Sequence, residues 1–360
     1  MFATMIALLQ FLFLGFPVAD DREPGLLLMF WNVENLFETR PHFGDKCNGI
    51  AKTIMLAGDE FDGVPDVIGL AEVENRQVVQ KLLSRTALRK LDYDIVHYDS
   101  PDHRGIDCAL LYRRSRFRLL LSKPCHLTDT SGRLLPTRDI LLVVLVPIPA
   151  GSQPLEGLST PGQGQGEGPA GDKWAQTTRD TVGGAGANIV SGVPPGAGLT
   201  GRRYLPASPV AILVNHHPSK VGKGSDGRRE LAMGRLLALR DSLMAEGIRR
   251  IVAVGDFNDE VTPAPGVEPA YPKGAGTIKF QGKWEKIDGC PVLEGLAARE
   301  HIFAPTHLST RDTRFSGTKP LRTFSGPRYL GGLSDHYPII LELEFVPENT
   351  PKREQTTEIE

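Results

Sequence analysis

Five apolar segments of this chain are bounded abruptly by acidic, amide or imidazole side chains, and this repeated pattern constrains the fold most. The run LLLMFW over residues 26–31 stops at Asn32, and a second run over residues 64–71 stops at Glu72. The other three borders are Asn215-His216-His217, Asp256-Phe257-Asn258 and Ser334-Asp335-His336. Short, continuous apolar runs are typical of strands buried on both faces. Because a buried strand end holds a polar group rigidly, the pattern predicts strands whose ends share one cleft.

The rest of the chain alternates between strand and helix patterns. Apolar residues at helical spacing predict helices over residues 75–90 and 226–246. Residues 277–284, with the sequence TIKFQGKW, alternate in polarity and indicate an edge strand. Further strands are expected at residues 93–98, 106–113, 116–122, 139–147, 209–214, 250–254, 286–295 and 337–345. These elements predict a layered α/β domain over residues 25–347.

Residues 148–203 interrupt this domain. They are dense in Gly, Pro, Ser, Thr and Gln and contain few aliphatic residues. Such a segment buries too little apolar surface to offset its ordering entropy, so we expect a largely disordered insertion. The strands before and after it are expected to be neighbours in one sheet. The segment is therefore interpreted as a long loop insertion within one domain, which loop-closure entropy tolerates well.

The two ends of the chain differ from the domain between them. Residues 1–19 are apolar and lack side-chain charge, which resembles a signal peptide, although no Lys or Arg precedes the apolar stretch. Secretion, or a periplasmic or cell-envelope location, is the expectation from this segment; a cytoplasmic location follows if it is not a signal. No other stretch has the character of a membrane span, so no stable membrane partner is expected. The tail 348–360 is polar and is expected to be frayed.

Charge and cysteine content exclude two classes of protein. The formal net charge of −2 argues against tight nucleic-acid binding by bulk positive charge, although it leaves room for a local basic patch. The four cysteines form no CxxC pair, so a zinc site built on them is not expected. Buried or free thiols are the favoured interpretation, with disulfides as the alternative if the chain is exported.

The polar groups at the strand borders favour metal-assisted attack on phosphorus. Their carboxylate and amide oxygens are the ligands that Mg²⁺ prefers, and imidazoles can polarise water or bind phosphate oxygens. The aspartates Asp256 and Asp288 are both candidates for pairing with a histidine, which raises imidazole basicity and fixes its tautomer. No P-loop, HExxH or GxSxG motif occurs, and no GxGxxG begins a predicted helix.

Three motifs in their order along the chain resemble the endonuclease/exonuclease/phosphatase superfamily. They are Leu70-Ala71-Glu72, Gly255-Asp256-Phe257-Asn258 and Ser334-Asp335-His336, and MFWNVENLFE is similar to the family's first strand. The resemblance runs from about residue 26 to residue 345 without the insertion. It implies a four-layer sandwich of two packed, mostly antiparallel β-sheets flanked by helices. It also implies dependence on Mg²⁺, with Mn²⁺ as a substitute.

The resemblance assigns roles residue by residue. The catalytic candidates that it implies are His216, Asp256, Asn258, Asp288 and His336. The candidate metal ligands are Asn32, Glu72 and Asp335. The candidate phosphate contacts are Asp107, Arg138, His217 and Lys220, with a surface ion pair as the alternative for Arg138 and Lys220. The adjacent histidines leave open whether residue 216 or residue 217 meets the scissile phosphate, and the general base is also left open.

The expected function is hydrolysis of phosphodiester bonds by a monomeric enzyme, with a nuclease as the leading interpretation. A phosphatase or phosphodiesterase for small or lipid phosphoesters is the alternative within this class. A non-catalytic binding protein with the same fold is the alternative outside it. The substrate is in each enzymatic case a phosphoester, and nucleic acid is the candidate macromolecular partner. The basic stretch over residues 311–328, just before the SDH motif, could line a groove for a polyanion or form a solvated loop.

Overall fold

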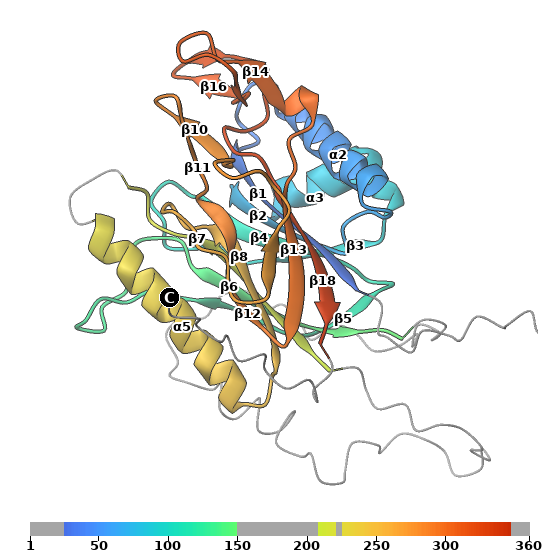
Figure 1. Ribbon diagram of the computed structural model, residues 1–360, viewed down its shortest axis with the longest axis vertical. Coiled ribbons are helices and arrows are strands. Elements are labelled where there is room, and N and C mark those ends of the chain that lie inside the picture. Colours follow the sequence, from blue (N-terminus) through green and yellow to red (C-terminus); the bar gives the residue numbers. More distant parts are fainter. Residues whose placement is uncertain (1–24, 150–207, 221–224, 347–360) are drawn as a thin grey trace, which may run out of the picture.

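The structure, a computed structural model, describes residues 25–149, 208–220 and 225–346. Segment 1–19, almost all of the insertion 148–203 and the tail 348–360 lie outside the described residues, so what the sequence predicts for them stays a prediction. The described chain forms the four layers that the sequence led us to expect. Two β-sheets pack face to face, and helices cover their outer faces (Figure 1).

The larger sheet has seven strands in the order β3-β4-β2-β1-β18-β13-β9. The central strand β1 pairs in parallel with β2 and antiparallel with β18. The strands of this sheet are β1 (Leu26–Leu36), β2 (Val67–Val73), β3 (Tyr93–His97), β4 (Asp107–Arg113), β9 (Val267–Pro269), β13 (Leu296–Ile302) and β18 (Ile339–Phe345). The first strand and the last strand of the domain therefore lie side by side, which brings the WNVEN segment next to the SDH motif.

The smaller sheet has five strands in the order β12-β8-β7-β6-β5. They are β5 (Phe117–Cys125), β6 (Ile140–Pro147), β7 (Val210–His216), β8 (Arg250–Asp256) and β12 (Asp288–Glu294). Strands β7 and β8 are parallel, and the other pairs are antiparallel. Because β6 pairs directly with β7, the two strands that flank the insertion are neighbours in one sheet, as predicted.

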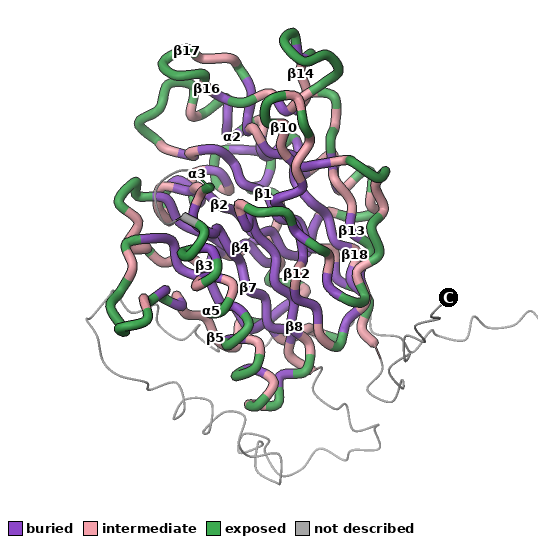
Figure 2. Tube along the Cα trace, turned by 60° about the vertical axis from the view of Figure 1, so that its left-hand side comes forward, coloured by how far each residue is buried: buried purple, intermediate pink, exposed green. Residues whose placement is uncertain are grey.

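The alternation of side chains along the strands explains the layers. In β1, Leu28 and Phe30 point into the core between the sheets, whereas Met29 and Trp31 point toward the outer helices. Each such side chain, when fully buried, stabilises the fold by about 1.5–3 kcal/mol. Helices α2 (Phe43–Glu60) and α3 (Arg76–Arg85) cover the larger sheet, and α5 (Ser225–Ala245) covers the smaller one. Figure 2 shows that burial is concentrated in the strands of both sheets.

Two elements differ from their predictions, because each is divided into two shorter elements. The expected edge strand over residues 277–284 is a hairpin, β10 (Ile278–Phe280) and β11 (Lys283–Glu285), because Gln281 and Gly282 turn with positive φ angles of 47° and 83°. The expected helix over residues 75–90 ends at Arg85. A 3₁₀ turn, η1 (Ala87–Lys90), follows it, since the Thr86 side chain caps the turn by accepting from Leu88 N.

Small hairpins gather at one end of the sandwich. The hairpin β10–β11 lies beside β14 (Ser309–Arg311) and β15 (Thr318–Pro320), and the 3₁₀ turn η2 (Thr306–Leu308) precedes them. A further hairpin, β16 (Phe324–Ser325) and β17 (Arg328–Tyr329), follows before the SDH motif. Sequence reasoning left the segment 306–335 without assigned structure. It is built from short hairpins that project beyond the two sheets (Figure 1).

Two observations bear on the sequence expectations for cysteines and membranes. All four cysteines are buried free thiols, which is the favoured interpretation from their spacing. Among the residues that the structure describes, no helix combines the length and apolar character required to cross a bilayer.

Candidate active site

The polar strand borders of both sheets meet at the end of the sandwich that carries the hairpins. Within the smaller sheet, Asp256 of β8 pairs in register with His216 of β7 on one side and with Asp288 of β12 on the other. The larger sheet supplies Asn32 from β1, whose Nδ2 donates to Asp256 Oδ2 over 3.0 Å. One buried hydrogen bond therefore joins the two sheets at the point where the predicted catalytic residues converge.

His336 is held as the partner of a buried carboxylate. Its Nδ1 lies 2.8 Å from Asp288 Oδ2, and its Nε2 lies 3.9 Å from Asp256 Oδ2. Burial by itself lowers the pKa of His336, but Asp288 and Asp256 outweigh burial and hold this pKa well above the usual value. The backbone fixes the ring further, because Ser334 Oγ accepts from His336 N and Trp31 Nε1 donates to His336 O. The ring is thus a charged donor in a fixed position.

Asp256 has a different environment from Asp288. Its carboxylate accepts hydrogen bonds from Asn32 Nδ2 and from Asn258 N, the latter over 2.9 Å, and it is almost fully buried. Burial, followed by the nearby charge of Asp288, raises the pKa of Asp256 to about 7. A carboxyl group with such a pKa can accept a proton near neutral pH.

The structure separates the two adjacent histidines. His216 Nε2 lies 3.6 Å from Asp256 Oδ2 and 3.8 Å from Glu72 Oε1, so this ring belongs to the cluster. His217 packs edge-on against Phe257, with the ring centres 4.8 Å apart. Burial is the first cause that lowers the pKa of both rings, to about 3 for His217, and nearby arginines add to it. Both imidazoles are therefore neutral, and the geometry favours residue 216 as the one that faces substrate.

A second group of carboxylates lies beside this cluster at two strand bulges. The pairing of β1 with β2 is irregular between Asn32 and Leu36, and that of β2 with β4 is irregular at residue 72. Glu34 and Glu72 both adopt left-handed backbone, with φ angles of 47° and 65°. Bulges re-aim side chains, and strain of this kind gathers at functional sites. Here it places two glutamates on neighbouring strands at the same end of the sheet.

Asp335 completes this second group. Arg322 connects it to Glu34, because Arg322 Nη2 lies 3.0 Å from Asp335 Oδ2 and Arg322 Nε lies 3.2 Å from Glu34 Oε1. Burial, and next the charge of Asp335, raises the pKa of Glu34. Burial also lowers the pKa of Lys46 to about 8, against the attraction of Glu34, Glu72 and Asp335. Glu34 and Asp335 therefore share Arg322, and Glu72 joins them in acting on Lys46; sequence reasoning missed Glu34.

With this geometry established, comparison with known proteins identifies the family. The sequence profile of the endonuclease/exonuclease/phosphatase family matches residues 39–145 and 265–345, more than half of the chain. The chain belongs to this family. It is thus a phosphoric ester hydrolase of the endonuclease/exonuclease/phosphatase type. The matched ranges include Glu72, Asp288 and His336 but not His216 or Asp256, which only the fold brings into the same site.

Solved structures agree in fold. An endonuclease/exonuclease/phosphatase family protein from Bacteroides thetaiotaomicron superposes with a TM-score of 0.51 at 12% identity, over 90% of this chain and 98% of that chain. The mannosyl-6-phosphatase of the same organism gives a TM-score of 0.50 at 14% identity, over 89% of this chain and 100% of that chain. No curated protein matches the chain at a significant level. These likenesses show the shared sandwich, and the chemistry rests on the residues described above.

The endonuclease/exonuclease/phosphatase family is typically dependent on a divalent metal ion, and the residues present fit such an ion. Glu34, Glu72 and Asp335 offer oxygen donors, which a hard cation prefers, although both oxygens of Glu34 already accept hydrogen bonds, from Arg322 Nε and Thr323 N. Asn32, a predicted ligand, uses both ends of its amide elsewhere, because Oδ1 accepts from Glu34 N and Nδ2 donates to Asp256. The group Asp256–Asp288–His336 also has ligand atoms close together, but His336 already bonds to Asp288, and Asp256 accepts from Asn32 and Asn258 N.

The remaining predicted phosphate contacts lie outside the cluster. Lys220 Nζ is exposed and lies 2.6 Å from Glu285 Oε2. Arg138 is buried and pairs with Asp102, and it also donates to the backbone carbonyls of His216 and His217. Lys220 thus forms a surface ion pair, the alternative interpretation, whereas the ion pair of Arg138 is buried. None of the contacts of Lys220 and Arg138 given above involves Asp256 or His336. For both residues, a contact with phosphate stays a prediction.

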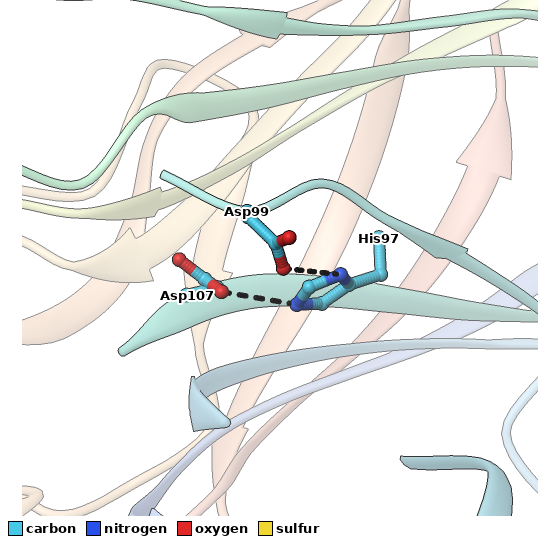
Figure 3. A group of neighbouring side chains, drawn as sticks. All are labelled: His97, Asp99 and Asp107. Atoms are coloured by element: carbon cyan, nitrogen blue, oxygen red, sulfur yellow. Dashed lines mark ion pairs between the residues drawn. The ribbon is translucent and has the colours of Figure 1, made fainter. Parts of the chain in front are cut away.

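Asp107 lies in a separate group at the edge of the larger sheet (Figure 3). Its Oδ2 is 3.2 Å from His97 Nε2, and its Oδ1 accepts from Ser100 N over 2.9 Å. On the other side of the same ring, Nδ1 of His97 lies 3.9 Å from Oδ1 of the exposed Asp99. We call His97, Asp99 and Asp107 the edge cluster. Its carboxylates lie at opposite nitrogens of one imidazole, an arrangement that suits an ion-paired ring better than a shared metal ion.

Proposed function

We propose that the protein is a Mg²⁺-dependent phosphodiesterase that cleaves by in-line attack of water, and that it acts as a nuclease. One observation carries the proposal: Asp256, Asp288, His216 and His336 converge from both sheets beside the carboxylates Glu34, Glu72 and Asp335. A proton acceptor, a charged donor and a set of oxygen ligands are the parts that phosphodiester hydrolysis requires. The first two are neighbours, because His336 Nε2 lies 3.9 Å from Asp256 Oδ2.

The chain's own residues account for the proton movements. Water attacks phosphorus, the P–O bond opposite to it breaks, and the carboxylate of Asp256 accepts the proton that water releases. Asn32 and Asn258 N hold that carboxylate in position. The imidazolium of His336, fixed by Asp288, donates to a phosphate oxygen whose charge grows in the transition state. The neutral imidazole of His216 lies close enough to Asp256 to bind the phosphate or the attacking water.

A magnesium ion on Glu34, Glu72 and Asp335 would neutralise charge on the phosphate and on the leaving oxygen. Mn²⁺ prefers similar oxygen ligands and is the expected substitute. The strain of Glu34 and Glu72 supports this assignment, because a left-handed glutamate persists only where the surrounding structure requires it.

The hairpins beside the site favour a nucleic acid as substrate. Residues 306–335 carry five Lys and Arg side chains against two Asp, so this rim is basic although the whole chain is not. Aromatic rings lie among them: His42 stacks on Tyr329 with ring centres 3.9 Å apart, and the Arg40 guanidinium lies over Phe324. Basic and aromatic groups together suit a phosphate backbone with stacked bases. The net charge of −2 instead favours a small phosphoester, which stays the second candidate.

Hydrolysis assays on the purified protein test the proposal. The substrates are plasmid DNA, RNA, bis-p-nitrophenyl phosphate and p-nitrophenyl phosphate, each with Mg²⁺ and with EDTA, and Glu72→Ala is the matched variant. Metal-dependent nicking of plasmid that is lost in the variant is the expected result. Turnover of only the two small esters would replace the nuclease assignment by the small-phosphoester one. A folded protein that is inactive on all four would contradict the proposed chemistry.

A further inference from the structure

A pocket of about 390 Å³ is lined by Arg138, which donates to the carbonyls of His216 and His217, and by Pro218, and no catalytic role described above uses it. Its lining includes Asp102, Arg104, Arg138, Pro218 and Arg228, and we call it the arginine pocket. The segments that line it come from the loop before β4, the segment before β6, the segment after β7 and the first turn of α5. These segments are distant in sequence and converge only in the fold.

Arg138 connects the arginine pocket to the catalytic histidine. The register of β6 with β7, Leu141 opposite Val214, places Arg138 opposite His217 when it is continued by three residues. From there Arg138 Nε donates to His216 O over 3.2 Å, and Nη2 donates to His217 O. The wall of the pocket is therefore the same stretch of backbone that positions His216 at the catalytic cluster.

The pocket has an excess of positive charge. Its lining carries three guanidinium groups and one carboxylate, that of Asp102. Asp102 is shared, because Arg138 Nη1 lies 3.1 Å and Arg104 Nε 3.4 Å from its oxygens. Arg228 is exposed and forms no ion pair with any residue in the described part of the chain. Arg138 has five N–H groups, three of which are used in the bonds named above, so donors are left over.

We propose that the arginine pocket binds a second phosphate group of the substrate while the scissile phosphate lies at Asp256 and His336. The inference rests on the proposed function, whose substrate class it narrows to phosphoesters that carry a second phosphate near the scissile one. Guanidinium groups bind phosphate oxygens through paired N–H donors, and arginine stays charged at every physiological pH. The volume is in the range of small-ligand pockets and exceeds the size of a single phosphate. An adjacent phosphate of a polynucleotide and the terminal phosphate of a small ester both meet this description.

The test uses competitive inhibition of bis-p-nitrophenyl phosphate hydrolysis. The inhibitors are alkane-1,ω-diyl bisphosphates with two to six methylene groups, and ethyl phosphate is the reference with one phosphate. We expect one spacer length to give an inhibition constant at least 10-fold lower than that of ethyl phosphate. In Arg104→Ala/Arg228→Ala the advantage should fall to 2-fold or less, while the inhibition constant of ethyl phosphate stays the same. Arg249→Ala/Arg299→Ala removes two exposed arginines outside the pocket and should keep the advantage.

Each outcome decides between the proposals. If no bisphosphate is favoured over ethyl phosphate, or if the control variant loses the advantage equally, the second-phosphate site is wrong although the hydrolase assignment stands. If the wild type does not hydrolyse bis-p-nitrophenyl phosphate, the proposed function fails on this substrate. Calorimetric titration of the same bisphosphates into wild type and Arg104→Ala/Arg228→Ala then tests the pocket directly. Comparison of TpT with pTpT and TpTp as substrates distinguishes a polynucleotide phosphate from the phosphate of a small ester.

Discussion

Two clusters in this molecule combine one histidine with two aspartates, and they differ in how the fold surrounds them. Asp256, Asp288 and His336 are all buried and come from three separate segments of the two sheets. The edge cluster comes from β3, β4 and the loop between them, and its Asp99 is exposed. In the first cluster Asp288 lies at Nδ1 of the His336 ring and Asp256 lies nearer to its Nε2. Asn32 and the backbone N–H of Asn258 donate hydrogen bonds that orient Asp256. In the edge cluster, the only further hydrogen bond to a carboxylate among the described residues comes from Ser100 N.

The comparison shows that residue types alone do not make a site. The edge cluster has the composition of the catalytic cluster, but its residues come from one pair of neighbouring strands and their loop, and its Asp99 is exposed. At the catalytic end, left-handed backbone occurs at Glu34, Glu72 and Asn258. Long-range convergence and complete burial together distinguish the proposed catalytic histidine–aspartate pair from the edge cluster.

The largest expected difference between the two clusters is in kcat, after the imidazole of each is removed in turn. His336→Gln removes a charged donor aimed at the phosphate, and we expect kcat to fall by about 10²- to 10⁴-fold. His97→Gln removes the matching ring of the edge cluster and should change kcat less than 3-fold. Steady-state kinetics on bis-p-nitrophenyl phosphate with saturating Mg²⁺ compare the two. A loss of similar size in both variants would contradict the distinction between the clusters.

The next effect concerns the metal ion and again uses a carboxylate from each region. Glu34→Gln replaces one of the three proposed carboxylate ligands by an uncharged side chain of nearly the same size. The Mg²⁺ concentration for half-maximal activity should therefore rise at least 10-fold. Asp99→Asn removes the same charge from the edge cluster and should leave that concentration unchanged. Activation curves from micromolar to millimolar Mg²⁺, repeated with Mn²⁺, measure it. An identical curve for Glu34→Gln and wild type would exclude Glu34 as a ligand.

Most of the fold and part of the site could be predicted from the sequence. The apolar run over residues 26–31 predicts a buried strand, and it forms one because both faces of its sheet are covered. The motifs around Asp256 and His336 lie at strand borders, as the sequence predicts. Glu34 was missed, although it lies two residues after Asn32 and the period of a strand puts both on one face. The bulge that turns its backbone left-handed depends on the partner strand β2, and no local pattern encodes that pairing.

Arg138 shows why other site residues could not be placed. The family resemblance made Arg138 a candidate phosphate contact, but the direction of its side chain depends on the register between β6 and β7. That register, across a long insertion, turns its guanidinium to the carbonyls of His216 and His217. The pairing of Lys220 with Glu285 likewise joins segments that only the fold brings together.

The third effect is on stability and depends on pH. Burial holds the pKa of His217 at about 3, below its ordinary value near 6.5. Between these values the unfolded chain binds a proton that the folded chain does not, so stability falls as pH drops below about 6.5. For this group the loss is about 2 kcal/mol between pH 7 and pH 5. His217→Asn should remove that part of the pH dependence, as measured by urea unfolding at both values. If the variant and the wild type differed in free energy of unfolding by the same amount at pH 7 as at pH 5, the prediction would be wrong.

The smallest effect tests what the edge cluster does if it is not catalytic. Asp107 accepts a hydrogen bond from Ser100 N and lies 3.2 Å from His97 Nε2, and these contacts hold the loop that carries Asp102 and Arg104 into the arginine pocket. His97→Gln should therefore lower the free energy of unfolding by about 1 kcal/mol, because the variant loses the packing of a buried ring and its contact with Asp107. Asp99→Asn, at an exposed position, should lower it by less than 0.5 kcal/mol. If His97→Gln left stability unchanged but reduced the preference for bisphosphates, the edge cluster would be part of the binding site.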